Sequence, residues 1–193
     1  MVNDDLGHAV GEDARADEVE RLRGMVRALE DRVQQLDRLA HQDSLIDLPN
    51  RRGFMRQLER FIDRVRRYGD QAAMLFVDLD GLKAINDKLG HAAGDEALIR
   101  VADLLAAGVR KSDFVARLGG DEFGILLERS DERMAVETSE RLARKISACE
   151  FSYDGQMLRL GVAIGVGLIH SDDTAASIMT RADKAMYEAK SAA

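Results

Sequence analysis

The stretch that most constrains the fold is Arg117 to Leu127, which reads RLGGDEFGILL. Two apolar, strand-like runs flank two glycines and two adjacent carboxylates, Asp121 and Glu122. Because glycines between such runs are typical of a hairpin turn, the pattern predicts two antiparallel strands. A neutral Asn-Gly pair would reverse the chain more simply, so the doubled negative charge at this turn indicates chemistry in addition to folding.

A second acidic site follows another predicted strand, AMLFVDLD, which ends in Asp78 and Asp80. These two carboxylates share a face because side chains alternate along a strand. If this strand lies beside the hairpin, Asp78 meets Asp121 and Glu122, and such carboxylates repel one another unless a divalent cation lies between them. Each pattern alone is explained by a solvated turn or a strand end. Together they predict a two-metal site for phosphoryl or nucleotidyl transfer.

The remaining periodicity predicts helices and strands in mixed order, an α+β class. We expect helices over 51–68, 81–89, 94–109, 132–148 and 174–190. We expect strands over 72–79, 114–118, 123–127 and 158–168, and a further one around Phe151. Pro49 and Asn50 mark the turn and the cap before the first of these helices.

The N-terminal region carries an apolar residue at every third or fourth position from Val19 to Ala40. Val at the first heptad position and Leu at the second favour a parallel two-stranded coiled coil, and an amphipathic helix packed on its own domain is the alternative. Charged residues beside the apolar heptad positions also attract each other between the two chains of such a coil. Glu18 of one chain, for example, would face Arg23 of the other. We expect disorder over residues 1–15, which are rich in acids, a coiled-coil dimerisation and signalling helix over 16–42, and a globular domain over 43–193.

Composition disfavours several other classes of protein. The formal net charge of −7 disfavours binding to a nucleic acid polymer, which needs a basic surface. No apolar run approaches the roughly 20 residues of a membrane-spanning helix, and the acidic N-terminus lacks the layout of a secretory signal. We therefore expect a cytoplasmic protein without a membrane partner. Cys149 is expected to be a small core residue.

Four motifs in order resemble the GGDEF domain of diguanylate cyclases, and they extend over about three quarters of the chain. In chain order they are the segment from Asp43 to Arg52, the segment from Val77 to Leu98, GGDEF (Gly119 to Phe123), and the segment from Ala182 to Lys190. The resemblance implies a palm-like nucleotidyl cyclase fold, with a central, mostly antiparallel sheet flanked by helices and preceded here by the coiled-coil helix.

The activity implied by the resemblance is the condensation of two GTP into cyclic di-GMP and two pyrophosphates across a homodimer, in which each domain holds one GTP. The coil would raise the effective concentration of the second domain. Mg²⁺, or Mn²⁺, would be held by Asp78, the carbonyl of Leu79, Asp121 and Glu122. Glu122 is either a further ligand or the base that deprotonates the ribose 3′-hydroxyl, and Lys83 neutralises charge on the phosphates.

Substrate-binding residues are implied in the same way. Asn86 and Asp95 resemble the pair that reads guanine, whose N1-H and N2-H suit a carboxylate acceptor, whereas adenine presents the wrong pattern. His91, between them, is either a helix-start residue or a substrate contact. Lys190 is expected at the phosphates. The absence of a Cβ at Gly119 and Gly120 lets the backbone approach the ligand.

A product-inhibition site is implied by Arg110 and Asp113, which resemble the family's Arg-x-x-Asp site, with Arg141 as an additional arginine. The alternative is an exposed charged loop. The sequence departs from the family at Ile46 and Asp47, at Leu82, and at Gly161 and Ala163, which we interpret as packing variants. The chain also stops at Ala193, where the family usually continues into Gly-Arg-Asn and a final strand, so Lys190 is kept for the phosphates while its partner arginine is absent.

Two rival functions follow from the same residues. A noncatalytic cyclic di-GMP receptor would use Arg110 and Asp113 to sense the nucleotide and its coil to contact a partner. Retained Asp78, Lys83 and the hairpin acids favour the enzyme, because a receptor has no need of metal ligands. A cyclase of altered base preference is disfavoured by Asn86 and Asp95.

Overall fold

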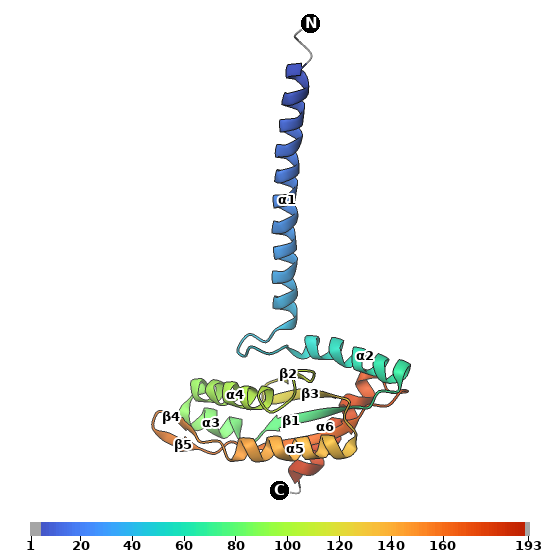
Figure 1. Ribbon diagram of the computed structural model, residues 1–193. Coiled ribbons are helices and arrows are strands. Elements are labelled where there is room, and N and C mark those ends of the chain that lie inside the picture. The colour runs from blue at the N-terminus through green and yellow to red at the C-terminus, as the bar shows by residue number, and fades with distance from the viewer. Residues whose placement is uncertain (1–4, 192–193) are drawn as a thin grey trace. The chain divides into compact units, whose positions relative to one another are not determined.

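The computed structural model of this protein describes residues 5–191, with side chains from residue 19 onward except those of 34 and 38 (Figure 1). The chain divides between Ala40 and His41 into two compact units. The first contains nearly all of helix α1 (Asp5–His41). The second contains every other helix and strand.

Helix α1 begins at Asp5, whereas we expected disorder through residue 15. Residues 5–15 contain good helix formers, such as Ala9 and Ala14, but also Gly7 and Gly11, so helix propensity alone does not explain this part of the helix. Residues 1–4 of the expected disordered segment lie outside the described residues. The larger apolar side chains that we assigned to the coiled-coil seam, from Val19 to Leu36, are between 45% and 65% exposed, whereas Ala40 at its end is partly buried.

The domain is built on a four-stranded sheet in the order β2-β3-β1-β6. The strands are β1 (Ala72–Leu79), β2 (Phe114–Gly119), β3 (Glu122–Glu128) and β6 (Val162–Leu168). Every neighbouring pair is antiparallel, which confirms the expected sheet. A separate hairpin pairs β4 (Phe151–Tyr153) with β5 (Gln156–Leu158).

The single strand expected over 158–168 is wrong, because β5 ends at Leu158 and β6 begins only at Val162. Between them Leu160 is buried, at 2% exposure, and the Gly161 carbonyl accepts a hydrogen bond of 2.9 Å from the Asp80 amide. These interactions direct the segment toward the end of β1, so the strand pairing is interrupted there.

Five helices surround the sheet: α2 (Arg51–Tyr68), α3 (Leu82–Leu89), α4 (His91–Ala106), α5 (Glu132–Ser147) and α6 (Ala175–Ser191). The Asn50 side chain caps α2, as expected, by accepting from the amides of Arg52 and Gly53. Helix α4 begins at His91 and not at residue 94, because Gly90, at φ +86°, ends α3 and allows α4 to start at once.

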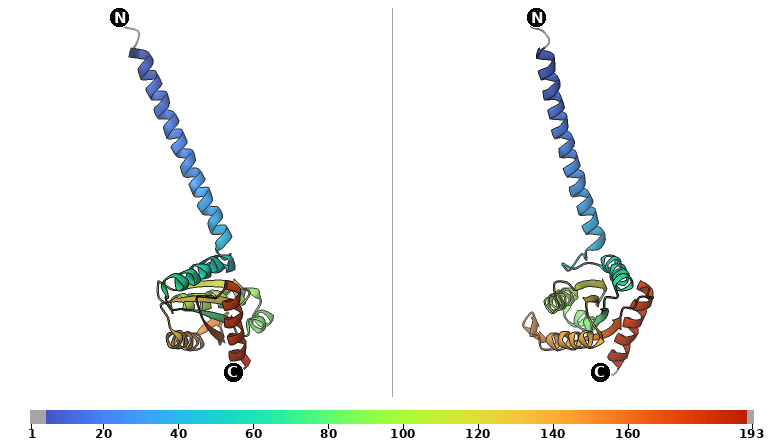
Figure 2. Two further views of the ribbon diagram at one scale, coloured as in Figure 1. Left: turned by 90° about the vertical axis from the view of Figure 1, so that its right-hand side faces the viewer. Right: turned by 45° about the vertical axis from the view of Figure 1, so that its right-hand side comes forward.

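The sheet separates two hydrophobic cores (Figure 2). Alternate residues of β1 divide between them: Leu75 and Val77 pack with α4 and α5, whereas Met74 and Phe76 pack with α2 and α6. Strand β1 is therefore covered on both faces, and seven of its eight residues are buried. A sheet buried in this way leaves polar side chains only at the ends of its strands, where the candidate site lies.

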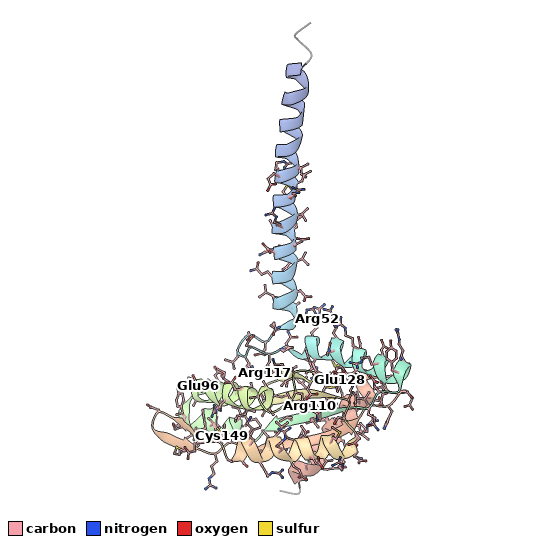
Figure 3. All side chains as sticks on the ribbon, in the orientation of Figure 1. Arg52, Glu96, Arg110, Arg117, Glu128 and Cys149 are labelled. Atoms are coloured by element: carbon pink, nitrogen blue, oxygen red, sulfur yellow. The ribbon has the colours of Figure 1, made fainter. Side chains whose placement is uncertain are left out.

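Among the described helices, including the 37-residue α1, none combines the length and the apolar character needed to cross a bilayer. Cys149, which we expected in the core, is only partly buried. The Arg100 Nε donates to its Sγ over 3.2 Å, so a polar contact at the surface takes the place of core packing (Figure 3).

Candidate active site

The end of β1 and the start of β3 bring the predicted acids together. Their antiparallel register sets Asp78 directly opposite Glu122. The amide of Leu79 donates to the carbonyl of Asp121 over 3.0 Å, which fixes the hairpin turn against the end of β1. The contact predicted between the second acidic site, at the end of β1, and the hairpin is therefore present in the fold.

The side chain of Lys190 reaches this acidic group from α6. Its ammonium donates to the Asp78 carboxylate and lies 3.7 Å from the Asp80 Oδ1. The hydrogen bond to Asp78 raises the pKa of Lys190, and the charges of Asp78, Asp80 and Asp121 act in the same direction. One cation thus lies among the carboxylates that we expected to bind metal.

The expected metal ligands do not form a closed cage of side chains. Among the side chains that the structure describes, those of residues 19–191 apart from 34 and 38, no three of His, Cys, Asp or Glu are grouped so that they could hold an ion by themselves. The expected set includes a backbone carbonyl, that of Leu79, and Asp78 is paired with Lys190. The donors are nevertheless hard oxygens around a point that already attracts a cation, which suits Mg²⁺ or Mn²⁺ completed by phosphate oxygens.

Glu122 has an altered acidity in this environment. Partial burial raises the pKa of its carboxyl group, the charge of Arg51 lowers it, and the charges of Asp121, Asp183 and Asp78 raise it further. Sequence reasoning missed Arg51 and Asp183 as members of the site. Both belong to the quoted family motifs, so the available signal was the motif itself, but nothing in their spacing places them beside Glu122.

The two residues expected to read guanine, Asn86 and Asp95, lie on the contacting helices α3 and α4. A Cβ added at Gly94 would lie 2.0 Å from the Asn86 Oδ1, so the Asn86 amide packs directly on the α4 backbone beside Asp95. Asn86 is half-buried, whereas Asp95, His91 and Lys83 are exposed. The structure therefore joins Asn86 to the helix start that carries His91 and Asp95.

A separate cavity of about 530 Å³ is lined by the three expected inhibitory residues, Arg110, which Figure 3 labels, Asp113 and Arg141. The Asp113 carboxylate accepts from the amide of Arg110 over 2.8 Å and from the amide of Glu128 over 3.1 Å. Arg141 Nη1 donates to a backbone carbonyl at 2.7 Å. We call this the Arg110 cavity. A further lining residue, Arg144, was missed, although it lies three positions after Arg141 on the same helix.

Two departures from the family pattern have structural explanations. Ile46 is 6% exposed and belongs to a hydrophobic core. A Cβ at Gly161 would lie 3.1 Å from the Asp80 Oδ2, so a side chain at this position would press on that carboxylate.

The profile of the family described as "Diguanylate cyclase, GGDEF domain" matches residues 40–193. The chain therefore belongs to the GGDEF-domain family of diguanylate cyclases, as its motifs indicated.

Individual relatives agree with this assignment. The chain is 39% identical over 185 residues to Diguanylate cyclase TpbB of Pseudomonas aeruginosa, covering 94% of this chain and 42% of TpbB. It is 38% identical over 159 residues to Probable diguanylate cyclase DgcE of Escherichia coli, covering 82% of this chain and 14% of DgcE. It thus spans less than half of either relative.

Among solved structures, the coiled coil and GGDEF domain of DgcB from Caulobacter crescentus, in complex with c-di-GMP, has a similar fold. The TM-score is 0.86 at 25% sequence identity, with 93% of this chain and 95% of that chain covered.

Proposed function

We propose that this chain is a diguanylate cyclase that condenses two GTP into cyclic di-GMP and two pyrophosphates across a homodimer. The observation that carries the proposal is the register of β1 and β3, which sets Asp78 opposite Glu122 and next to Asp121. Named diguanylate cyclases among the relatives support the same reaction.

In this reaction the 3′-hydroxyl oxygen of one GTP forms a bond to the α-phosphorus of the other, and the bond to pyrophosphate breaks. Glu122 takes the hydroxyl proton or serves as a ligand, and its raised pKa makes it a stronger base than an ordinary glutamate. Mg²⁺ or Mn²⁺, bound through Asp78, the Leu79 carbonyl, Asp121 and Glu122, would neutralise developing charge on the phosphates. Lys83 and Lys190 supply further positive charge.

Selectivity for guanine is assigned to Asn86 and Asp95. The close packing of Gly94 on Asn86 supports this role, because it fixes the amide beside the residue expected to accept from guanine. Gly119 and Gly120 are exposed at the turn, and without a Cβ they let the protein backbone lie close to the nucleotide. His91, exposed at the first residue of α4, is proposed as a substrate contact.

Two copies of the chain are needed because each domain would bind one GTP. The exposed apolar stripe of α1 supports pairing of two α1 helices in a coiled coil. DgcB, whose solved structure contains a coiled coil and a GGDEF domain, has the same order of parts.

The proposal is tested by incubating the purified chain with GTP and Mg²⁺ and separating the nucleotides by chromatography. We expect cyclic di-GMP and pyrophosphate in a ratio of one to two. Asp121→Asn should lower turnover by more than about 100-fold, since metal stabilisation is worth several kcal/mol and about 1.4 kcal/mol is tenfold. Asp154→Asn is the control, because Asp154 lies in the exposed turn between β4 and β5, outside the expected site. Near-normal turnover by Asp121→Asn would contradict the proposal.

Product binding in the Arg110 cavity is the second part of the proposal. Three arginines, Arg110, Arg141 and Arg144, line this cavity, and such a cluster favours a ligand with two phosphates. Arg110→Ala should raise the cyclic di-GMP concentration that halves activity by roughly 10-fold or more. The control is Arg60→Ala, which removes an exposed arginine of α2 that does not line the cavity. Equal inhibition of Arg110→Ala and the unmodified chain would exclude the site.

The same cavity favours a second candidate function, a cyclic di-GMP receptor without turnover. Calorimetric titration separates the two functions. Cyclic di-GMP binding that depends on Arg110, in a chain that forms no product from GTP, would identify a receptor.

A further inference from the structure

Residues 42–50, which follow α1 in the chain, form a closed turn that we call the entry turn. Its ends are bridged between Gln42 and Pro49. At its centre the Asp43 Oδ1 accepts from the amides of Leu45 at 2.9 Å and Ile46 at 3.1 Å, and the Ile46 side chain is buried in the core. This segment is thus a structured part of the domain.

One arginine of the GGDEF hairpin binds the entry turn. Arg117, on β2, donates from Nη1 to the Asp43 Oδ1 over 3.1 Å, and its backbone amide donates to the Pro49 carbonyl over 2.9 Å (Figure 3). The two side chains of the ion pair are only 15% and 17% exposed. An ion pair with so little access to water is weakened less by solvent screening than a surface pair.

The same guanidinium also holds the hairpin turn. Arg117 Nε and Nη2 donate to the Gly120 carbonyl over 3.1 and 2.7 Å. Gly120 is the residue before Asp121, and the β2-β3 pairing is irregular between Arg117 and Gly119. An irregular ladder fixes a turn less firmly than a regular one, so the hydrogen bonds of the guanidinium determine the position of Gly120 more strongly.

We propose that Asp43 and Arg117 are positioning residues that couple the entry turn to the acidic turn of the active site. Asp43 orients the guanidinium, the guanidinium fixes Gly120, and Gly120 sets the direction of Asp121 and Glu122 toward Asp78. A displacement of the entry turn therefore changes the geometry of the expected metal ligands. The kinetic part of this inference rests on the proposed cyclase activity, and the structural part does not.

The structural part is tested by amide hydrogen exchange of the full chain followed by NMR. Asp43→Asn keeps an oxygen for the Leu45 and Ile46 amides but removes the charge that holds Arg117. We expect exchange at least about 10-fold faster at the Leu79 amide, which donates to Asp121, and at the Arg117 amide, which donates to Pro49. Amides of the β4-β5 hairpin should keep their rates.

The kinetic part is tested by measuring kcat and KM for GTP in the same variant. Misplaced catalytic groups lower turnover steeply, so we expect a loss of about 10- to 100-fold in kcat and less than about a twofold change in KM. Arg117→Lys should reproduce this loss, because one ammonium cannot serve both Asp43 and Gly120 as the planar guanidinium does. If Asp43→Asn does not fold, hydrogen exchange and kinetics are both measured on Arg117→Lys.

Asp70→Asn is the matched control, since it breaks an ion pair with Arg64 at the opposite end of β1. Unchanged exchange at Leu79 and Arg117, or an equal loss of kcat in Asp70→Asn, would overturn the coupling. An unmodified chain that forms no cyclic di-GMP would contradict the proposed function alone, and the exchange measurement would still decide whether the entry turn positions the acidic turn.

Discussion

Gly94 shows how a single residue can fix the position of a proposed specificity residue, Asn86, without touching the substrate. It is buried inside α4, and any Cβ there would meet the amide oxygen of Asn86 at 2.0 Å. Gly is unfavourable within a helix by about 1 kcal/mol relative to Ala, so its presence here serves the contact between α3 and α4.

Gly94→Ala is predicted to displace the Asn86 amide and to leave the helix intact. A polar group that loses its partner costs about 1–3 kcal/mol, so KM for GTP should rise roughly 10-fold while helix content stays the same. Steady-state kinetics and circular dichroism check both parts. Ala92→Gly is the control for helix propensity on the exposed side of α4. A KM that is unchanged in Gly94→Ala would remove Asn86 from substrate binding.

Lys190 has two partners in the proposed cycle, the carboxylates in the free protein and the phosphates in the complex. Without nucleotide it binds Asp78, so it competes with a divalent cation for the same oxygens. Lys190→Met should therefore bind Mn²⁺ more tightly in the absence of GTP, by up to roughly fivefold for an ion pair of about 1 kcal/mol that is partly exposed to solvent.

The measurement is a titration of free Mn²⁺ by electron paramagnetic resonance. Lys184→Met is the control, because Lys184 lies on the same helix and pairs with Glu188. Equal Mn²⁺ affinity in Lys190→Met and the unmodified chain would show that Lys190 does not compete with the ion.

Among the elements, α6 depends on one buried acid at its start. Asp173 is 6% exposed and accepts from the His170 amide and the Ser177 hydroxyl, each at 2.8 Å, and from the Arg181 guanidinium. Burial alone would raise the pKa of Asp173, but the hydrogen bonds from Arg181, His170 and Ser177 outweigh it and lower the pKa. This helix delivers Lys190 to the active site, so its anchoring affects function.

Asp173→Asn is predicted to lower the free energy of unfolding by about 1.5–3 kcal/mol at pH 7, the range for hydrogen bonds to a charged group. Because the pKa is lowered in the folded state, this stabilisation is complete above the unfolded aspartate pKa of about 3.9 and is lost as pH falls through the folded value. Urea unfolding at pH 7 and pH 3 should show a difference that shrinks in acid. Asp172→Asn, at the exposed neighbouring position, should be close to neutral at both values.

For the whole molecule, the proposed activity requires two chains, and the exposed stripe of α1 is the surface proposed to join them. Leu29→Asp puts a charge at a predicted seam position that is 62% exposed in one chain. We expect a shift from dimer to monomer in analytical ultracentrifugation. We also expect a specific activity that falls at low protein concentration and recovers as the concentration rises, by mass action.

Ala28→Asp is the matched control, since it places the same side chain on the outer face of the predicted coil. If Leu29→Asp and Ala28→Asp form equally stable dimers, the coil is not the dimer interface.

The sequence alone determined much of the local structure of this protein. The bounds of α2 and β1 were predicted to the residue. For α2, a strong amphipathic period, the Asn50 cap and Gly69 after its last residue all agree. The motif GGDEF with Asp78 and Asp80 also predicted the acidic site, since strand ends that carry carboxylates keep them whatever the packing. These signals are local and need no knowledge of distant residues.

Only the tertiary structure decided which distant groups complete the site. Arg51 beside Glu122, Lys190 between Asp78 and Asp80, and Arg117 between Asp43 and Gly120 come from segments up to 112 positions apart. The break between β5 and β6 is likewise set by contacts with the end of β1. Sequence periodicity reports which face of an element is buried, but not which neighbour covers it, because that depends on the packing of all the elements together.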